Sequence, residues 1–140
     1  MQTTSSDNKW ALLAIDHNTN WIVASATKDA KANTVADFLY KKIFLKFGNP
    51  AEIISDRGTQ FTSEVLEEYL EIQKVKHNLT SAYHPMSNGK TERANGVIGA
   101  ALNKLAYRHK NKWDAYLDQA VWATRIWKHS VTKISPYFLV

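Results

Sequence analysis

Two carboxylates, Asp56 and Glu92, stand where the sequence could build a metal-dependent reaction site. Asp56 follows the short apolar segment 51–55, and Glu92 lies near the start of a long helical pattern, within SNGKTERANG. Their numbers differ by 92 − 56 = 36, so 35 residues intervene. Two divalent cations about 3.5–4 Å apart can activate an attacking oxygen and stabilise a leaving oxygen in phosphoryl transfer. Mg²⁺ prefers oxygen ligands, so the pair predicts such a site without Cys or His.

Each carboxylate also has an ordinary structural interpretation. An Asp before Arg57 and Gly58 is a common turn residue. A Glu in the first turns of a helix is favoured by the helix dipole. Only the combination of both motifs with the loop between them favours the catalytic interpretation.

The apolar patterns predict which elements position these residues. Segments with strand character come first, then a strand–helix–strand unit, and then helices, which is typical of a layered α/β domain. A turn-rich segment at 16–20 joins the first two strands as a hairpin, and a loop at 80–89 precedes the long helix. Asn33 or Thr34 can cap the first helix. The predicted strands are 10–15, 21–27, 51–55 and 75–79, and the predicted helices are 34–47, 63–73, 90–107 and one beginning near 112.

Composition limits the class of protein. A chain of 140 residues is long enough for one domain, and no apolar run reaches the roughly 20 residues that a membrane span needs. Cysteine is absent, which excludes disulfides and thiolate metal sites. The net charge of +5 favours a polyanionic partner. Five Trp residues could stack on bases, but the apolar patterns around Trp10, Trp21, Trp113 and Trp127 favour core packing.

Three stretches carry a resemblance to a known family: SDRGTQFTS, TSAYHPMSNGKTERANG and HSVTKISPYFLV. They resemble the integrase catalytic core of gypsy-type LTR retrotransposons and retroviruses, and the similarity runs from about Trp10 to the end of the chain. The resemblance implies an RNase H-like three-layer α/β fold with a mixed sheet. It also implies DNA 3′-end processing and strand transfer with Mg²⁺ or Mn²⁺, a homo-oligomeric parent enzyme, a nuclear location and no membrane.

The resemblance assigns roles residue by residue. The family uses two Asp and one Glu, of which Asp56 matches the second carboxylate and Glu92 the third. In the family, the loop and helix around the Glu lie against DNA. Asn88 could cap the helix, and Tyr83 could offer an aromatic face to a nucleotide. The expected nucleic-acid contacts are Tyr83, Asn88, Lys90, Arg93 and Asn95.

The first family carboxylate has no good match in this chain. Asp16 completes the order Asp, Asp, Glu, but it lies at a hairpin, where we interpret it as a turn residue. Only two predicted strands precede the first helix, whereas a five-stranded RNase H-like sheet needs three. Residues 1–9 form a polar leader that cannot fill a buried central strand, and we expect this leader to be loose. Residues 10–140 are therefore expected to be an integrase core that lacks its first, central strand.

These expectations lead to one principal hypothesis and two alternatives. We expect a polynucleotidyl transferase core that is inactive as an isolated chain, because one metal-binding carboxylate is missing. The alternative is a domesticated or decayed integrase that binds DNA or protein without catalysis. A nuclease of the RNase H-like class is a weaker third hypothesis.

Overall fold

The computed structural model describes residues 3–55, 59–79 and 85–126. The chain divides into two compact units. The first contains Met1–Lys28 and Lys90–Val140, and the second contains Asp29–Gly89. Each unit has its own two-stranded sheet and its own buried apolar residues.

The first unit contains the predicted β-hairpin. Strand β1 (Trp10–Ile15) pairs antiparallel with β2 (Ile22–Thr27), and Ile15 lies opposite Ile22 next to the turn. The Asp16 carboxylate accepts a hydrogen bond from the Asn18 backbone N–H at 2.8 Å, and Asn20 has a positive φ of 62°. Asp and Asn support such local bonds and tolerate the left-handed region, so this sequence forms a tight turn.

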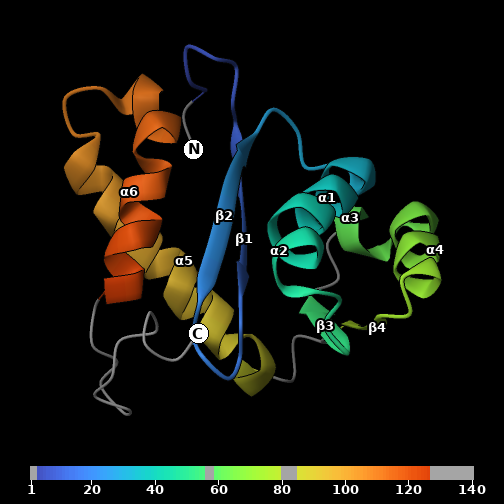
Figure 1. Ribbon diagram of the computed structural model, residues 1–140. Coiled ribbons are helices and arrows are strands. Elements are labelled where there is room, and N and C mark those ends of the chain that lie inside the picture. Colours follow the sequence, from blue (N-terminus) through green and yellow to red (C-terminus); the bar gives the residue numbers. More distant parts are fainter. Residues whose placement is uncertain (1–2, 56–58, 80–84, 127–140) are drawn as a thin grey trace. The chain divides into compact units, whose positions relative to one another are not determined.

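Helices α5 (Pro85–Leu105) and α6 (Trp113–Ile126) complete the core of this unit, joined by a turn and the short 3₁₀ helix η2 (Lys110–Lys112). One apolar face of each strand packs against the helices, as expected for a sheet of period two. Figure 1 shows the hairpin with α5 and α6. The buried core residues are Ile22, Ala24, Ala94, Ile98, Leu102, Ala106, Trp113, Leu117, Ala120 and Val121.

Helix α5 begins earlier than the sequence predicts. The backbone is helical from Pro85, whereas we expected a loop as far as Gly89, so the predicted capping role of Asn88 is wrong. A proline is well suited to the first turn of a helix because it has no N–H to leave unpaired. The weak helix formers Ser87, Asn88 and Gly89 lie in the same helix, which shows that its context overrides their propensity.

The N-terminal residues contact α6. The side chains of Thr4 and Asn8 both donate to the Asp114 carboxylate, at 3.0 and 2.8 Å, and Thr4 is buried. The Ser5 N–H also donates to the Asn111 carbonyl at 3.0 Å. The prediction of a loose leader is therefore wrong for residues 4–8. A polar segment without periodicity can still be ordered when its hydrogen bonds end on a distant element.

The second unit contains the predicted strand–helix–strand segment. Strands β3 (Glu52–Ser55) and β4 (Lys76–Leu79) are parallel, with Ile53 opposite His77. Between them lie α3 (Thr59–Thr62), which we did not predict, and α4 (Glu64–Ile72). The Ser63 hydroxyl caps α4 by accepting from the Val65 N–H at 3.2 Å.

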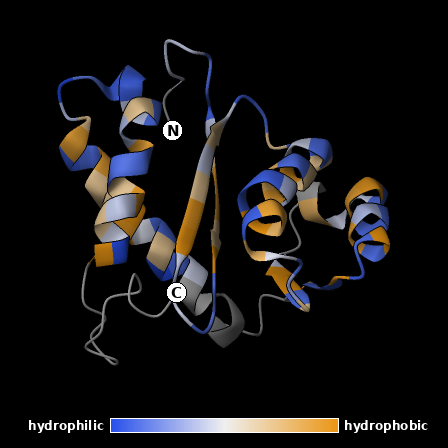
Figure 2. Ribbon diagram, viewed as in Figure 1, coloured by the Kyte–Doolittle hydropathy of each residue, from blue (hydrophilic) through white to orange (hydrophobic). Residues whose placement is uncertain are grey.

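The first predicted helix forms as three consecutive pieces. These are α1 (Ala32–Leu39), the π-helical turn η1 (Tyr40–Phe44) and α2 (Leu45–Phe47), and Gly48 follows with a positive φ of 83°. Figure 2 shows hydrophobic and hydrophilic residues on different parts of these helices and of α4. Phe44 stacks on Tyr69 of α4 with ring centroids 6.1 Å apart. The buried apolar residues of this unit are Val35, Phe38, Leu39, Phe44, Leu66, Leu70 and Val75.

The strand count agrees with one expectation. Within residues 3–55, 59–79 and 85–126, β1 and β2 precede the first helix, as predicted, and four strands form two separate pairs. The described residues therefore form no five-stranded sheet.

Candidate metal and nucleic-acid site

Strand β3 ends at Ser55, immediately before the predicted ligand Asp56. The sequence therefore places this carboxylate directly after a strand, as expected. Asp56 itself and the predicted loop residue Tyr83 lie outside the described residues.

Glu92 lies on α5 and its side chain is exposed. Within the part of the chain that the structure describes, no basic side chain forms an ion pair with it. The convergence of Glu92 with Asp56 stays a prediction.

The other predicted nucleic-acid contacts lie on the same helix. Arg93 and Asn95 are exposed, and they flank Ala94, which is buried in the core. Asn88 and Lys90 belong to the backbone of α5, while their side chains lie outside the described part. The buried Ala94 keeps its turn of α5 against the hairpin core, so its two polar neighbours face solvent.

Asp16 has the geometry of a turn residue. Its side chain is exposed, its carboxylate accepts from the Asn18 N–H, and its carbonyl accepts from the Asn20 N–H at 2.8 Å. Both bonds close the hairpin. This is the structural role that we predicted for Asp16, and it needs no metal.

The one predicted ligand that the structure describes, Glu92, is of a type that suits a hard cation. Carboxylates are the ligands that Mg²⁺ prefers, and Glu92 offers one from a regular helix. Among the described residues, no three His, Cys, Asp or Glu side chains come together as a metal-binding group. A complete site would therefore need Asp56 and a further carboxylate beside Glu92.

A contact that the sequence did not suggest lies at the end of β3. The Ser55 hydroxyl and the His77 Nε2 atom are 2.6 Å apart, one residue before Asp56. Burial lowers the pKa of His77, and the nearby charge of Glu67 opposes this effect. The sequence contains five histidines, and none of them has the paired spacing of metal ligands. Only the parallel pairing of β3 with β4 could therefore have indicated that His77 contacts Ser55.

The tryptophans divide between core and surface. Trp113 is buried, as predicted, but Trp10 is 52% exposed, so the prediction of core packing is wrong for Trp10. Trp127 lies outside the described residues. Trp21 is partly buried, and the guanidinium of Arg125 lies over its ring at 4.0 Å from the centroid. Arg125 Nη2 also donates to the Ile22 carbonyl at 2.8 Å, which ties α6 to the hairpin.

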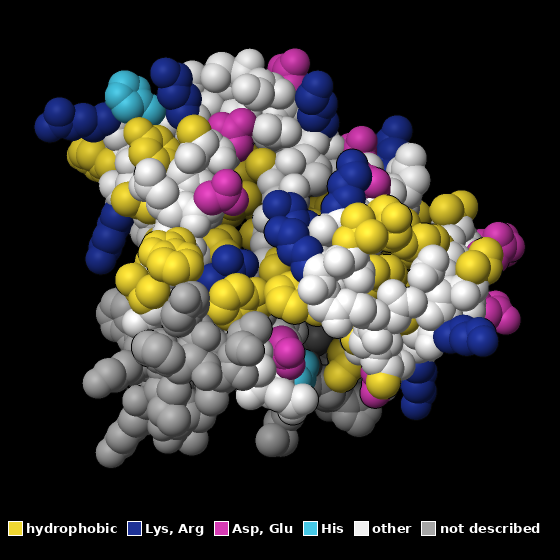
Figure 3. Space-filling model, viewed as in Figure 1, with side chains coloured by type: hydrophobic (Ala, Val, Ile, Leu, Met, Phe, Trp, Pro, Cys, Tyr) yellow, Lys and Arg dark blue, Asp and Glu magenta, His cyan; other side chains and the backbone are white. Residues whose placement is uncertain are grey.

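Positive charge is concentrated in the first unit. Residues 1–28 and 90–140 contain 11 Lys and Arg against 5 Asp and Glu, whereas residues 29–89 contain 7 against 8. Figure 3 shows dark blue Lys and Arg side chains near the connection between α5 and α6. The basic balance of the whole chain therefore arises in the unit that carries Glu92.

Comparison with known families identifies the chain. Residues 2–85 match the family model of the integrase core domain. The chain belongs to this family. The resemblance that we inferred from the three sequence motifs is therefore confirmed.

The curated relatives of this integrase core domain are retroviral and retrotransposon polyproteins. The Gag-Pol polyprotein of avian reticuloendotheliosis virus is 30% identical over 125 residues, which cover 89% of the chain and 11% of the relative. The Pol polyprotein from transposon 412 of Drosophila melanogaster is 25% identical over 137 residues, which cover 98% of the chain and 11% of the relative. The chain thus spans about a tenth of the length of these relatives.

Solved structures of retroviral integrases share the fold. The simian T-cell lymphotropic virus intasome, determined with a PP2A regulatory subunit, matches with a TM-score of 0.82 and 21% identity. The match covers 92% of the present chain and 47% of the viral chain. The HTLV-2 integrase catalytic core in complex with magnesium, in a trimeric form, matches with a TM-score of 0.71 and 23% identity, covering 89% and 79%. The catalytic core of BIV integrase matches with a TM-score of 0.75 and 20% identity. The match covers 92% of the present chain and 83% of the BIV chain. The predicted RNase H-like α/β fold class is confirmed.

The described helices include none that is both long enough and apolar enough to cross a membrane.

Proposed function

We propose that this chain is the central part of an integrase that trims DNA 3′ ends and joins them to a target DNA. The observation that carries the proposal is the match of residues 2–85 to the integrase core domain. Beyond the matched segment, Glu92, which the motif assigns to the last carboxylate, is exposed on α5. DNA is the proposed partner, and the nucleus, where chromosomal DNA lies, is the proposed location.

Asp56 and Glu92 are the proposed ligands of Mg²⁺ or Mn²⁺. When bound, the cations would supply a Lewis acid that stabilises charge on the attacking and leaving oxygens. The protein's part is to hold the Glu92 carboxylate on the regular helix α5, while β3 ends at the residue before Asp56. Rigid elements position ligands more precisely than loops do. The HTLV-2 relative was solved with magnesium, which supports the proposed metal.

Oligomer formation is also proposed for the parent enzyme. The related structures include an intasome and a trimeric catalytic core. The first unit presents exposed apolar side chains on α5 and α6, including Val97, Trp122 and Ile126. Apolar groups on a surface favour association because contact removes them from water.

Strand-transfer assays test the proposal. We expect the isolated chain to have no activity, or almost none, with Mg²⁺ or Mn²⁺ and duplex DNA, because only two of the three expected carboxylates are present. Without a ligand, a two-metal site loses part of the clamp that stabilises the attacking and leaving oxygens. Mn²⁺ binding followed by electron paramagnetic resonance should instead detect weak binding that falls in Asp56→Asn and in Glu92→Gln.

Asp16→Asn is the matched control for these variants, since it replaces a carboxylate that we assign to the hairpin turn. It should bind Mn²⁺ as the unchanged chain does. Strand transfer that Asp56→Asn abolishes would support the integrase function and overturn the predicted inactivity. Mn²⁺ binding that neither Asp56→Asn nor Glu92→Gln changes would refute the proposed ligands.

A DNA-binding module without catalysis is the second candidate. The concentration of positive charge in residues 1–28 and 90–140 favours it, because phosphate binding requires charge and no metal site. This candidate predicts DNA binding that persists in EDTA, together with no cleavage when Mn²⁺ is added. Binding that requires the metal would contradict it.

A further inference from the structure

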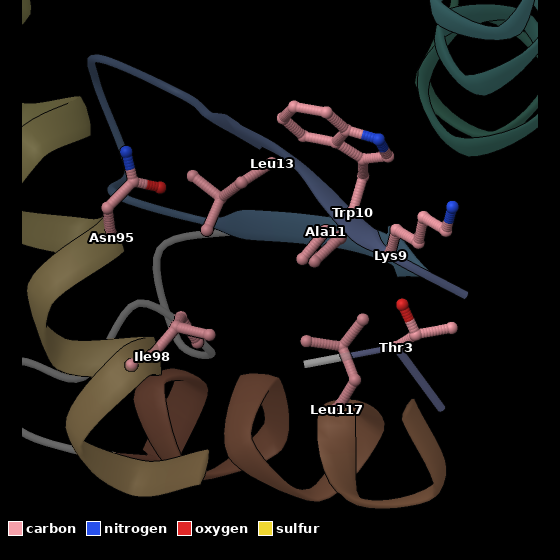
Figure 4. A pocket seen from close by; sticks show the side chains of 10 residues that line it. Thr3, Lys9, Trp10, Ala11, Leu13, Asn95, Ile98 and Leu117 are labelled. Atoms are coloured by element: carbon pink, nitrogen blue, oxygen red, sulfur yellow. The ribbon is translucent and has the colours of Figure 1, made fainter. Parts of the chain in front are cut away.

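The cavity beneath the hairpin has a mainly apolar lining. Its volume is about 570 Å³, and strand β1 and helices α5 and α6 contribute most of its walls. Figure 4 shows the polar side chains of Asn95 and Lys9 towards opposite ends, with the apolar Leu13 and Leu117 between them. Polar groups that orient a ligand need to converge. Within the described part of the chain, a closer meeting of two polar side chains lies in the second unit, between β3 and β4.

Ser55 and His77 make this contact between the two parallel strands. The Ser55 hydroxyl and the His77 Nε2 atom are 2.6 Å apart. In the register of the strands, Ile53 lies opposite His77 and Ser55 lies opposite Leu79. Side chains two residues apart on a strand share a face, so the imidazole reaches along the sheet to the last residue of β3. The contact therefore joins the strands one residue before Asp56.

A histidine at this position has an energetic cost. Its Nδ1 atom is buried and has no hydrogen-bond partner among the described residues. A buried polar atom without a partner destabilises a fold. The neighbours on this face, Ile53 and Leu79, are apolar and partly buried, so an apolar side chain would fit the position of His77 without an unpaired atom. What the imidazole adds is its contact with the Ser55 hydroxyl at the strand end.

We propose that His77 is a positioning residue for Asp56, because it holds Ser55 against β4 and so fixes the backbone that leads into Asp56. This inference rests on the proposed function, in which Asp56 binds Mg²⁺ or Mn²⁺. Groups that bind a metal must be held within about 0.5 Å of their productive positions. The ends of an element open more readily than its centre, and β3 has only four residues. A side-chain bond at the last of them limits the movement of the next residue.

The start of β3 supplies a matched control. The Asn78 Nδ2 atom donates to the Glu52 carboxylate at 3.1 Å, which also joins β4 to β3 through side chains. Asn78 follows His77 directly, but its bond ends on the first residue of β3 rather than on the last. His77→Leu and Asn78→Leu therefore each remove one side-chain bond between the same two strands, at opposite ends of β3.

Mn²⁺ binding to the full chain, followed by electron paramagnetic resonance, tests the role. At about pH 7.5 the ring of His77, whose pKa burial lowers, stays neutral. We expect His77→Leu to raise the Kd for Mn²⁺ about tenfold, since losing a group that orients a metal ligand typically costs 10–100-fold in affinity. Asn78→Leu should stay within about twofold of the unchanged chain. Urea denaturation checks that each variant is folded.

Two further variants separate positioning from packing. In His77→Gln the terminal amide reaches about as far as Nε2, so this variant should bind Mn²⁺ within about twofold of the unchanged chain. Ser55→Ala removes the other side of the contact and should weaken binding as His77→Leu does. The double variant should bind no more weakly than either single variant, because both remove one interaction. Ser55→Ala carries the test alone if His77→Leu does not fold.

The outcomes separate this inference from the proposed function. If Asp56→Asn and Glu92→Gln weaken Mn²⁺ binding but His77→Leu does not, the ligands stand and the positioning role is wrong. Equal losses in His77→Leu and Asn78→Leu would assign the effect to the stability of the strand pair and would also overturn the role. If Asp56→Asn binds Mn²⁺ as the unchanged chain does, or the unchanged chain binds none, the ligand assignment fails and the positioning role fails with it.

Discussion

The Ser55–His77 contact sits at the strand end that precedes Asp56. Nε2 of His77 is 2.6 Å from the Ser55 hydroxyl, while Nδ1 is buried and has no hydrogen-bond partner among the described residues. A charged imidazole donates from both nitrogens and would leave a buried N–H unpaired. Burial accordingly lowers the pKa of His77 below its ordinary value of 6.5, against the opposing charge of Glu67. The folded chain therefore favours the neutral ring.

This pKa gives the stability a pH dependence with a definite sign. Below about pH 6.5, the unfolded chain takes up a proton at His77 that the folded chain resists. The free energy of unfolding should therefore fall as the pH drops from 7 to 5, by at most about 1.4 kcal/mol per pH unit from this group. Urea denaturation at several pH values measures the change.

His77→Gln should flatten the profile between pH 7 and 5, whereas the exposed His109→Gln should leave it unchanged. Identical profiles for His77→Gln and the unchanged chain would show that another group is responsible.

At the residue scale, the motifs single out Asp56 and Glu92 as predicted ligands because their neighbours form long ordered strings, and these roles stay predictions. No local pattern in the sequence distinguishes Trp10 from Trp113. Trp10 begins an apolar strand and is still half exposed, because the first position of an edge strand has little to pack against. The stacking of Arg125 on Trp21 joins residues that lie more than 100 positions apart, so no local signal could indicate it.

At the scale of elements, the N-terminal turn and α6 depend on each other. Asp114 lies in the first turn of α6 and accepts from Thr4, Asn8 and its neighbour Ala115. Burial acts to raise the pKa of Asp114, but the hydrogen bonds from Asn8, Thr4 and the backbone outweigh it and lower the pKa overall. A carboxylate at a helix N-terminus is also favoured by the helix dipole. The turn therefore stabilises the start of α6.

Thr4→Val should test this coupling. It keeps the shape of a buried side chain and removes one donor to Asp114, so we expect a loss of about 1–2 kcal/mol in the free energy of unfolding. Urea denaturation at pH 7 measures it. Ser6→Ala, an exposed change in the same turn, should stay within about 0.5 kcal/mol. An equal effect of the two substitutions would contradict the assigned role of Thr4.

Periodicity predicted most elements of the chain, and the failures have physical causes. The hairpin, the helix after Ser63 and the parallel pair have strong apolar patterns, and all of them formed. Helix α5 begins five residues early because the helix context outweighs the low propensity of Ser87, Asn88 and Gly89. The π-helical turn at Tyr40–Phe44 adds an extra residue within one helix, which the spacing of apolar residues does not reveal.

At the scale of the whole molecule, the sequence predicted the fold class but left the site open. The motifs identified the integrase core, and the family match and the retroviral structures agree with it. The convergence of Asp56 with Glu92 stays a prediction, because the spacing in the sequence gives only the 35 intervening residues. Residues 1–9 contain a single apolar side chain, that of Met1, and the absence of the first, central strand stays a prediction.

The uneven distribution of charge gives a prediction for the whole chain. If the first unit binds duplex DNA through phosphates, the logarithm of the affinity should fall linearly with the logarithm of salt concentration, by about 0.9 per phosphate contacted. Replacing Arg93, Lys104 and Arg108 by Gln removes three exposed charges of this unit and should reduce the slope by about 2–3. Fluorescence anisotropy with a labelled duplex in EDTA measures it.

The matched control is a variant of the second unit in which Gln replaces Lys41, Lys42 and Lys46. This variant has the same net charge as the first, so a purely global electrostatic effect would change both slopes equally. A local interface on α5 would change only the first. Equal slopes of log affinity against log salt concentration for the two variants would therefore assign DNA binding to net charge rather than to the helix that carries Glu92. An affinity that does not vary with salt concentration would exclude phosphate contacts.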